Sequence, residues 1–285
     1  MNKTVYKAKK LICIVAIFSI SIICVFSQNV AFLDVRKSNE QKTPQAEEHI
    51  SQIEHYENII RIIRRKLPTL VDAQTGAIDA TGKYVDTPEG IQGLNCAGFA
   101  KFIADGFYAP IRRQQGKTDL YMSVSKLRQR YFDLRGDEFT SKWEWERDPY
   151  FGLDWTRNIA SQLGQLRENT SFDHEAFDVR DKSVWKYSED TGYPTEYVQE
   201  ILEKMAKEHP NRWYLASVNS WYGHTPELWQ HHHIICLFPY YDKKGMFHCV
   251  VFERNNETSL ASVLRRFPGS FLHLVWLSAE GDFQL

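Results

Sequence analysis

The chain contains Gly93-Leu94-Asn95-Cys96-Ala97-Gly98-Phe99, where a loop rich in Gly, Asp and Thr gives way to apolar residues at helical spacing. Phe99, Ile103 and Phe107 form one stripe of this pattern, which predicts a helix from about Cys96 to Phe107. The stretch therefore places a cysteine at the N-terminus of a helix.

A thiol in this position is suited to nucleophilic catalysis. The unpaired N–H groups and the dipole of a helix N-terminus favour an anion, so we expect the pKa of Cys96 to be lowered toward the nucleophilic thiolate form. The same N–H groups can hold the oxyanion of a tetrahedral intermediate, and the small residues Ala97 and Gly98 are expected to leave space for a substrate. The alternative is a buried structural cysteine, because free Cys is among the most buried residue types.

A general base for this thiol is expected among three consecutive histidines, His231-His232-His233, which precede a predicted strand at 234–240. A second strand is predicted at 246–252, after the turn Asp242-Lys243-Lys244-Gly245. A glycine at the end of such a loop suits the left-handed position of a hairpin. The two strands are therefore expected to pair antiparallel.

The length of the hairpin loop determines which side chains share a face. With a three-residue loop, Asp242 pairs with Met246 and His233 lies opposite Asn255, while Glu253 lies on the same face. We therefore expect His233 to be the general base and Glu253 or Asn255 to orient its imidazole.

Other interpretations of the histidines stay open. A two-residue loop would bring His232 onto the face of Glu253, so His232 is the second candidate for the base. His248 lies on the opposite face and is less suited. A metal site is disfavoured, because adjacent strand residues point to opposite faces and no further ligand pattern is present. We expect no metal and no cofactor, and the histidines could also be surface polar residues.

The apolar patterns predict helices first and strands later. A helix with isoleucines at helical spacing is expected between Pro44 and Pro68. The later patterns are helical at 158–166, 195–206 and 259–266, and strand-like at 213–218, 234–240, 246–252 and 271–277. This order predicts an α+β fold in which N-terminal helices pack on an antiparallel sheet.

The N-terminal residues 1–27 are typical of a secretory signal. Lysines within residues 3–10 precede the apolar run Leu11–Phe26, and the small residue Ser27 suits cleavage. An uncleaved run would instead anchor the chain in a membrane. Residues 28–70 are expected to form a linker and the amphipathic helix, and residues 71–285 a catalytic domain exported to the periplasm or cell envelope.

Composition sets further limits. The chain has 285 residues, of which 43% are apolar and 25% are charged, as is typical of a globular protein with a substantial core. Its formal net charge of −1 disfavours a nucleic-acid partner. Outside the signal, Cys96, Cys236 and Cys249 do not form a disulfide framework, and Cys236 and Cys249 differ in strand parity.

The cysteine motif is similar to that of the NlpC/P60 and CHAP superfamily of papain-like cell-wall cysteine peptidases and amidases. In that family a Gly-apolar-Asp-Cys-Ser-Gly-Phe type of motif opens a helix and a Tyr commonly precedes it, as Tyr84 does here. Asn95 and Ala97 depart from the Asp and Ser of the motif. The segments 233–235 and 253–255 resemble the strand that brings the family's His and the Glu-x-Asn of CHAP domains.

The resemblance implies a papain-like fold and hydrolysis of an amide bond in peptidoglycan, either in the stem peptide or at its junction with the glycan. Cys96 would attack the carbonyl, His233 would transfer the proton, and Glu253 or Asn255 would orient the imidazole. The N–H of Cys96, together with the hydroxyl of Tyr84, would hold the oxyanion. The alternatives are an acyltransferase or amidase on a non-wall substrate and a catalytically inactive envelope-binding protein.

The spacing between Cys96 and His233 is longer than this resemblance implies. Residues 110–205 are therefore expected to be a mostly helical insertion. Its tryptophans would pack in a core or line a sugar or peptide groove; they are Trp143, Trp145, Trp155 and Trp185.

Overall fold

The computed structural model describes residues 44–87, 90–131, 148–222 and 228–285. The predicted signal and linker lie outside these residues, as do Trp143 and Trp145. The contacts of the chain group residues Glu48–Leu285 into one unit. Within the described residues, no helix combines the length and the apolar character needed to cross a membrane.

The centre of this unit is a six-stranded sheet with the order β3-β8-β4-β5-β6-β7, in which all neighbours pair antiparallel. Its strands are β3 Tyr193–Pro194, β4 Arg212–Tyr222, β5 Leu228–Tyr241, β6 Phe247–Glu253, β7 Asn256–Ser259 and β8 Phe271–Ser278. A separate two-stranded sheet joins β1 Ala77–Ile78 to β2 Tyr84–Val85.

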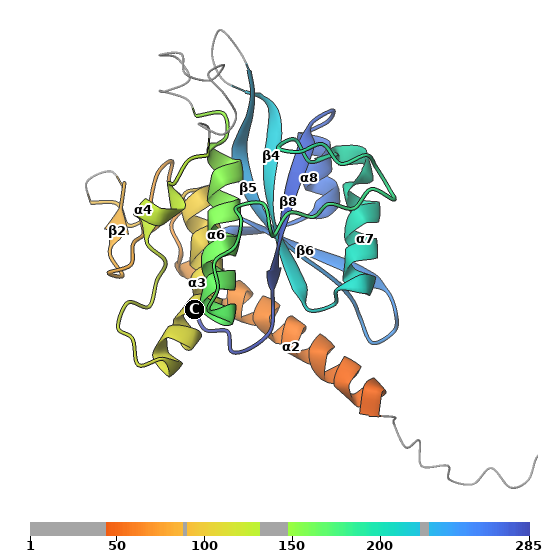
Figure 1. The fold of residues 1–285 in the computed structure, drawn as a ribbon, viewed down its shortest axis with the longest axis horizontal. Helices are drawn as coiled ribbons and strands as arrows, with labels where there is room; N and C mark the ends of the chain where they lie inside the picture. Colours follow the sequence, from red (N-terminus) through yellow and green to blue (C-terminus); the bar gives the residue numbers. More distant parts are fainter. Residues whose placement is uncertain (1–43, 88–89, 132–147, 223–227) are drawn as a thin grey trace, which may run out of the picture. The chain divides into compact units, whose positions relative to one another are not determined.

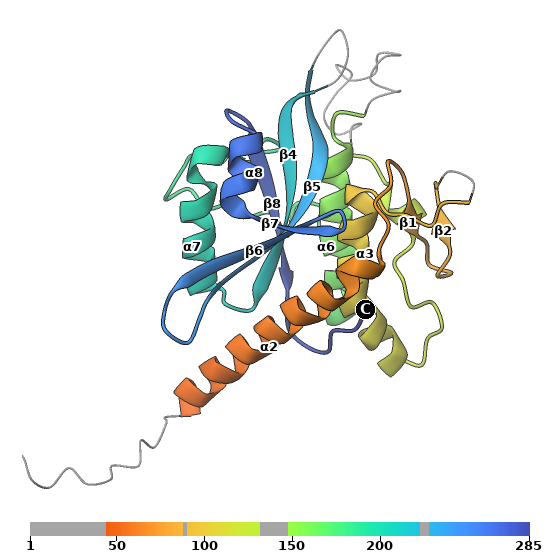
Figure 2. The ribbon, with the colours of Figure 1, turned by 180° about the vertical axis from the view of Figure 1, so that it is seen from behind.

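Helices cover both faces of the large sheet. They are α2 Pro44–Lys66, α3 Cys96–Gln114, α4 Val124–Leu127, α6 Phe151–Glu168, α7 Val198–Glu208 and α8 Leu260–Arg266, with 3-10 turns at Leu67–Thr69 and Thr195–Tyr197. The helices α2, α3 and α6 share one hydrophobic core with the sheet, and α7 and α8 share another with its opposite face. Figures 1 and 2 show these two groups on either side of the strands.

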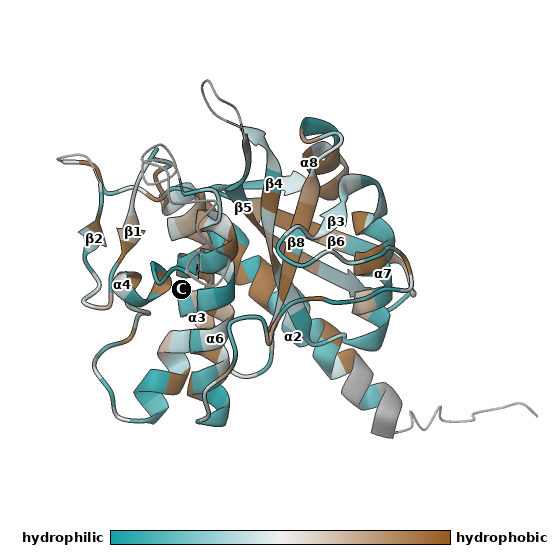
Figure 3. Ribbon diagram, turned by 45° about the horizontal axis from the view of Figure 1, so that its top comes forward, coloured by the Kyte–Doolittle hydropathy of each residue, from teal (hydrophilic) through white to brown (hydrophobic). Residues whose placement is uncertain are grey.

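Strand alternation explains the two cores. Along β4, Trp213 and Leu215 pack in the core of α3 and α6, whereas Tyr214 and Ala216 pack in the core of α7 and α8. In Figure 3 the central strands are largely hydrophobic, and the surrounding helices carry hydrophilic residues as well. The predicted α+β class, with helices packed against an antiparallel sheet, is confirmed.

The hairpin between β5 and β6 has the predicted register. Tyr241 pairs with Phe247, and the N–H of Asp242 donates to the carbonyl of Met246 at 2.9 Å. Gly245 has a φ of 75°, a left-handed conformation that glycine adopts without steric cost. The three-residue loop therefore forms, and it sets the face on which each later residue lies.

A β-bulge interrupts the pairing of β5 with β4 at the histidines. Val218 pairs with His233, but the next residue, Asn219, pairs with His231. His232 is thus an extra residue of β5, which changes the alternation of side chains at this point. The strict alternation assumed from the sequence does not hold there.

The segment 110–205, predicted as a mostly helical insertion, contributes to the main core. The helix α6 contacts α3, β5 and β8, and it places Trp155, Ile159 and Leu163 in the core that α3 shares with the sheet. Part of the segment is irregular and includes the short strand β3.

Candidate active site

The helix α3 begins with a side-chain cap. Asn95 has extended backbone angles, and its Oδ1 accepts a hydrogen bond from the N–H of Gly98 at 2.8 Å. The N–H of Phe99 donates to the carbonyl of Asn95, also at 2.8 Å. Asn95 is therefore the N-cap, and Cys96 is the first residue of the helix, as predicted.

A neighbouring loop holds the residues before the helix in place. The N–H of Leu94 donates to Val71 at 2.9 Å, and the N–H of Asn95 donates to Gly76 at 3.2 Å. On the other side, the indole Nε1 of Trp155 in α6 donates to the carbonyl of Ala97 at 2.9 Å. The first turn of α3 is thus anchored to two separate parts of the chain.

The expectation that Ala97 and Gly98 leave space for a substrate is wrong. Ala97 is fully buried, and a Cβ at Gly98 would lie 2.0 Å from the carbonyl oxygen of Gly76. The space beside these small residues is filled by the backbone of the chain itself, so Gly98 permits close packing of the loop against α3.

His233 lies in β5 directly after the bulge, and its imidazole interacts electrostatically with the thiol of Cys96 beside it. Its Nε2 lies 2.8 Å from Oε2 of Glu253, the last residue of β6. Because Glu253 occupies Nε2, the nitrogen that remains for Cys96 is Nδ1. The structure thus brings Cys96, His233 and Glu253 together in one row.

The electrostatics of this row favour a thiolate and an imidazolium. Burial raises the pKa of Cys96, but His233 and the N–H groups of Ile234 and Ala97 outweigh it, so the pKa lies below that of an ordinary thiol. Burial lowers the pKa of His233, but Cys96 and Glu253 outweigh it and raise the pKa to about 9. The two groups titrate as a pair and stabilise each other's charged form.

The N–H of Ile234 acts on the Cys96 thiol beyond the point where β5 pairs with β6. The pairing of these strands begins at Cys236 and Phe252, so Ile234 has no partner residue in β6. Its backbone N–H instead helps to lower the pKa of Cys96. The sheet therefore favours the thiolate in addition to the helix N-terminus.

The turn after β6 positions Glu253. Arg266 of α8 donates to Oε1 of Glu253, opposite the oxygen that faces His233. Arg254 forms an ion pair with Asp72 at 2.5 Å, and Nδ2 of Asn255 donates to the carbonyl of Leu70 at 3.3 Å. Two partners were expected for His233. Glu253 contacts the imidazole, whereas Asn255 bonds to Leu70, in the segment that precedes the cysteine motif.

Cys96, His233 and Glu253 open into a polar cavity of about 790 Å³. Its other lining residues are Asp72, Gln74, Asn95, Phe151, Tyr222, His232, Arg254, Asn256, Arg266 and Phe267. A volume of this size accommodates a ligand of several hundred daltons.

No family model, curated protein or solved structure matches this chain.

Tyr84 is placed away from this cavity. It lies in β2 and lines a separate pocket of about 400 Å³ together with Asp105 and Tyr121. The expectation that its hydroxyl holds an oxyanion at Cys96 is therefore not supported by its position.

The other predicted histidines have distinct surroundings. His231 is buried, with Nδ1 2.9 Å from Ser217 and Nε2 2.7 Å from the carbonyl of Asp190. His232 lines the Cys96 cavity beside His233 because of the bulge. His248 lies near the far end of the hairpin, where its Nε2 is 3.0 Å from Asp242. Within the described residues, no group of three or more His, Cys, Asp or Glu side chains could hold a metal ion.

Among the described residues, the remaining cysteines and tryptophans do not line this cavity. Cys236 and Cys249 are free thiols, and burial raises the pKa of both. Trp155 is a core residue, and Trp185 stacks on Tyr197 with ring centroids 4.4 Å apart. The two described tryptophans of 110–205 therefore pack rather than form a wall of the Cys96 cavity.

Several lining residues were missed from the sequence. Tyr222 ends β4, which extends beyond the predicted end at Val218, and Gln74 lies in the loop that was assigned no role. Phe151 begins α6, and Phe267 follows α8. A longer apolar and aromatic pattern after Val218, in Trp221 and Tyr222, is the one signal that could have indicated this wall.

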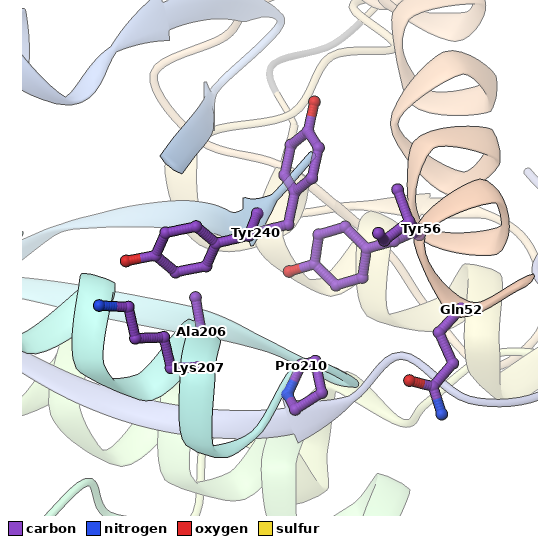
Figure 4. Close-up of a pocket in the computed structure, with 8 residues that line it drawn as sticks. Gln52, Tyr56, Ala206, Lys207, Pro210 and Tyr240 are labelled. Carbon is purple, nitrogen blue, oxygen red and sulfur yellow. The ribbon is translucent and has the colours of Figure 1, made fainter. Parts of the chain in front are cut away.

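A second hollow lies between α2, α7 and β5 and has a volume of about 300 Å³ (Figure 4). Tyr56, Tyr240 and Lys207 line it, and the hydroxyl of Tyr56 donates to the carbonyl of Arg212 at 2.9 Å. Its lining includes no cysteine or histidine, so it lacks the nucleophile and base of the larger cavity.

Proposed function

We propose that this chain is an exported cysteine hydrolase of amide bonds with a papain-like arrangement of its catalytic groups. The observation that carries the proposal is the position of the His233 imidazole, between the Cys96 thiol and the Glu253 carboxylate, at the wall of a large polar cavity. A nucleophile, a base and an orienting group in this order are the requirement for covalent catalysis by a thiol.

In the first half of the reaction, the thiolate of Cys96 attacks the carbonyl carbon and the C=O electron pair moves to the oxygen. The backbone N–H of Cys96 and the side-chain amide of Gln74 are the donors proposed for this oxyanion. When the intermediate collapses, the C–N bond breaks and the leaving nitrogen takes a proton from the imidazolium of His233. A thioester on Cys96 remains.

In the second half, neutral His233 takes a proton from water as the water oxygen attacks the thioester carbon. The C–S bond then breaks, the carboxylic acid leaves, and the thiolate and imidazolium are restored. Glu253 stays ionised throughout and holds the imidazole in one orientation, as its lowered pKa requires.

The substrate class proposed is peptidoglycan. It is supported by the similarity of the cysteine motif to cell-wall peptidases and amidases and by the secretory-signal pattern in residues 1–27. The motif supports the chemistry, and the signal pattern supports delivery to the cell envelope. The cavity volume is compatible with a substrate that combines a peptide and a sugar.

The test is digestion of purified sacculi by the wild type, Cys96→Ala and His233→Ala, with Cys249→Ala as the matched control. We expect the first two substitutions to reduce the release of soluble fragments by about a thousandfold or more, as for other triad members. Cys249→Ala should retain activity, because this thiol lies outside the cavity. Undiminished activity of a folded Cys96→Ala protein would overturn the proposal.

A further inference from the structure

One wall of the Cys96 cavity consists of two stacked rings. The rings of Tyr222 and His232 lie 4.3 Å apart with an interplanar angle of 3°. Both residues line the cavity, and Tyr222 is 54% exposed. Phe267 contacts the edge of His232, with centroids 5.9 Å apart. The wall therefore presents a supported aromatic face to the cavity.

The pairing of β4 with β5 holds this wall in place. Nε2 of Gln230 donates to the carbonyl of Tyr222 at 2.6 Å, and Nδ1 of His232 lies 3.3 Å from the carbonyl of Gln230. The hydroxyl of Ser220 lies 3.4 Å from the same Nδ1, so the ring is held from both strands of the pair. Burial lowers the pKa of His232, and the adjacent His233 lowers it further, so the ring stays neutral.

The charges of the cavity are already paired with one another. Asp72 pairs with Arg254, and Glu253 pairs with both Arg266 and His233. The thiolate of Cys96 pairs with His233. A charged substrate group would have to compete with these pairs, whereas the aromatic face offers stacking to an uncharged group.

We propose that Tyr222 and His232 form a subsite for an N-acetylated amino-sugar ring, with the apolar face of the sugar on the ring of Tyr222 and His232 supporting that ring from beneath. This inference rests on the proposed function and specifies it. A sugar beside Cys96 selects the amide bond at the junction of glycan and peptide rather than a bond within the stem peptide.

The subsite is tested without turnover, by titrating Cys96→Ala protein with a soluble N-acetylglucosamine oligosaccharide in a calorimeter. We expect binding that Tyr222→Ala weakens about tenfold or more, in line with the loss of one stacking aromatic, and that Tyr222→Phe retains. His232→Phe keeps a ring under Tyr222, so it should retain binding, whereas His232→Ala removes the support and should weaken it.

The matched control is Trp221→Ala. Trp221 is the neighbour of Tyr222 in β4 and is similarly exposed, at 58%, but it does not line the cavity. The Trp221→Ala substitution should leave the affinity for the oligosaccharide unchanged. Equal affinity of Tyr222→Ala and the parent protein, or equal weakening by Trp221→Ala, would overturn the subsite.

A second measurement separates this inference from the proposed function. Wild-type protein is incubated with a muramoyl peptide and with the corresponding lactoyl peptide, which keeps the same amide bond but lacks the sugar ring. Cleavage that depends on Cys96 and on the sugar supports the subsite. Cleavage of both substrates at equal rates overturns the subsite but leaves the hydrolase intact, and sugar binding without cleavage that depends on Cys96 overturns the hydrolase alone.

Discussion

Oε2 of Glu253 lies 2.8 Å from Nε2 of His233, and this contact leaves Nδ1 as the nitrogen that faces Cys96. The carboxylate thus determines both the orientation and the charge of the imidazole. Its second oxygen is held by Arg266, so the carboxylate itself has a fixed orientation.

Glu253→Gln tests this role. The amide keeps the shape but lacks the charge that helps to raise the pKa of His233. We expect the pKa of His233 to fall and activity to decrease by about tenfold to a hundredfold, as for other groups that orient a catalytic histidine. Asn255→Ala is the matched control, since Asn255 bonds to Leu70 instead. NMR titration of the His233 imidazole measures its pKa in both variants. A larger change of this pKa in Asn255→Ala than in Glu253→Gln would contradict the orienting role of Glu253.

Two substitutions at the N-cap residue Asn95 distinguish its effect on the stability of the helix from its effect on the thiol of Cys96. Asn95→Ala removes the acceptor of the Gly98 N–H, so we expect a loss of about 0.5–2 kcal/mol in the free energy of unfolding. Asn95→Asp keeps the cap but adds a negative charge beside Cys96, so the pKa of Cys96 should rise while stability is retained. Denaturant titration and thiol alkylation measure the two effects, and an unchanged pKa in Asn95→Asp would count against an anionic sulfur at this position.

Gly98 is predicted to be intolerant of a side chain. In Gly98→Ala the new Cβ would meet the backbone of Gly76, which cannot move without displacing the loop, and we expect a loss of about 1–3 kcal/mol in the free energy of unfolding. Gly106→Ala is the control in the same helix, because its Cβ would meet side-chain atoms of Phe283 and Leu285 near the C-terminus. Chemical denaturation should show the larger loss for Gly98→Ala, and equal losses would contradict this explanation.

A buried ion pair links α6 to the irregular segment before β3. Nε of Arg157 donates to Asp178 at 3.0 Å and Nη2 donates to it at 2.7 Å, and both side chains are buried. Burial raises the pKa of Asp178, but His273 and Arg157 outweigh it and hold the pKa below its usual range. A depressed carboxyl pKa stabilises the fold above the pKa of the unfolded state, and this stability is lost as the pH falls toward the folded-state pKa.

Asp178→Asn should therefore lower the free energy of unfolding by about 1–3 kcal/mol at neutral pH, because it removes the buried countercharge of Arg157 and leaves only Asp190, 2.6 Å from Nη1. It should also flatten the acid limb of the stability curve. Arg180→Ala is the control, since Arg180 is 42% exposed and lies 3.6 Å from Asp178. Denaturant titrations at several pH values compare the two, and an unchanged acid limb in Asp178→Asn would contradict the linkage.

Local sequence signals were sufficient for much of the fold and for the core of the site. The loop ending in Gly245 determined the register of β5 and β6, and that register predicted correctly that Glu253 shares a face with His233. The helix that begins at Cys96 followed from its apolar periodicity, which is local. These features depend on residues close together in the chain.

Features that depend on distant contacts were not predictable. The bulge at His232 arises from the pairing of β5 with β4, and nothing in the three histidines themselves indicates an extra residue. The environment of Gly98 is determined by Gly76, and Tyr84 lies in the short sheet of β1 and β2, away from Cys96. In each case the deciding neighbour belongs to a segment that the local pattern does not specify.

The central claim is that Cys96 and His233 form a thiolate–imidazolium pair, and the rate of Cys96 alkylation by iodoacetamide as a function of pH tests it most directly. We predict a midpoint below the value of about 8.5 for an ordinary thiol, and a rise of that midpoint in His233→Ala. Cys236 and Cys249, whose pKa values are raised by burial, should react far more slowly and serve as internal references. A wild-type midpoint at or above the ordinary value, unchanged by His233→Ala, would contradict the pair.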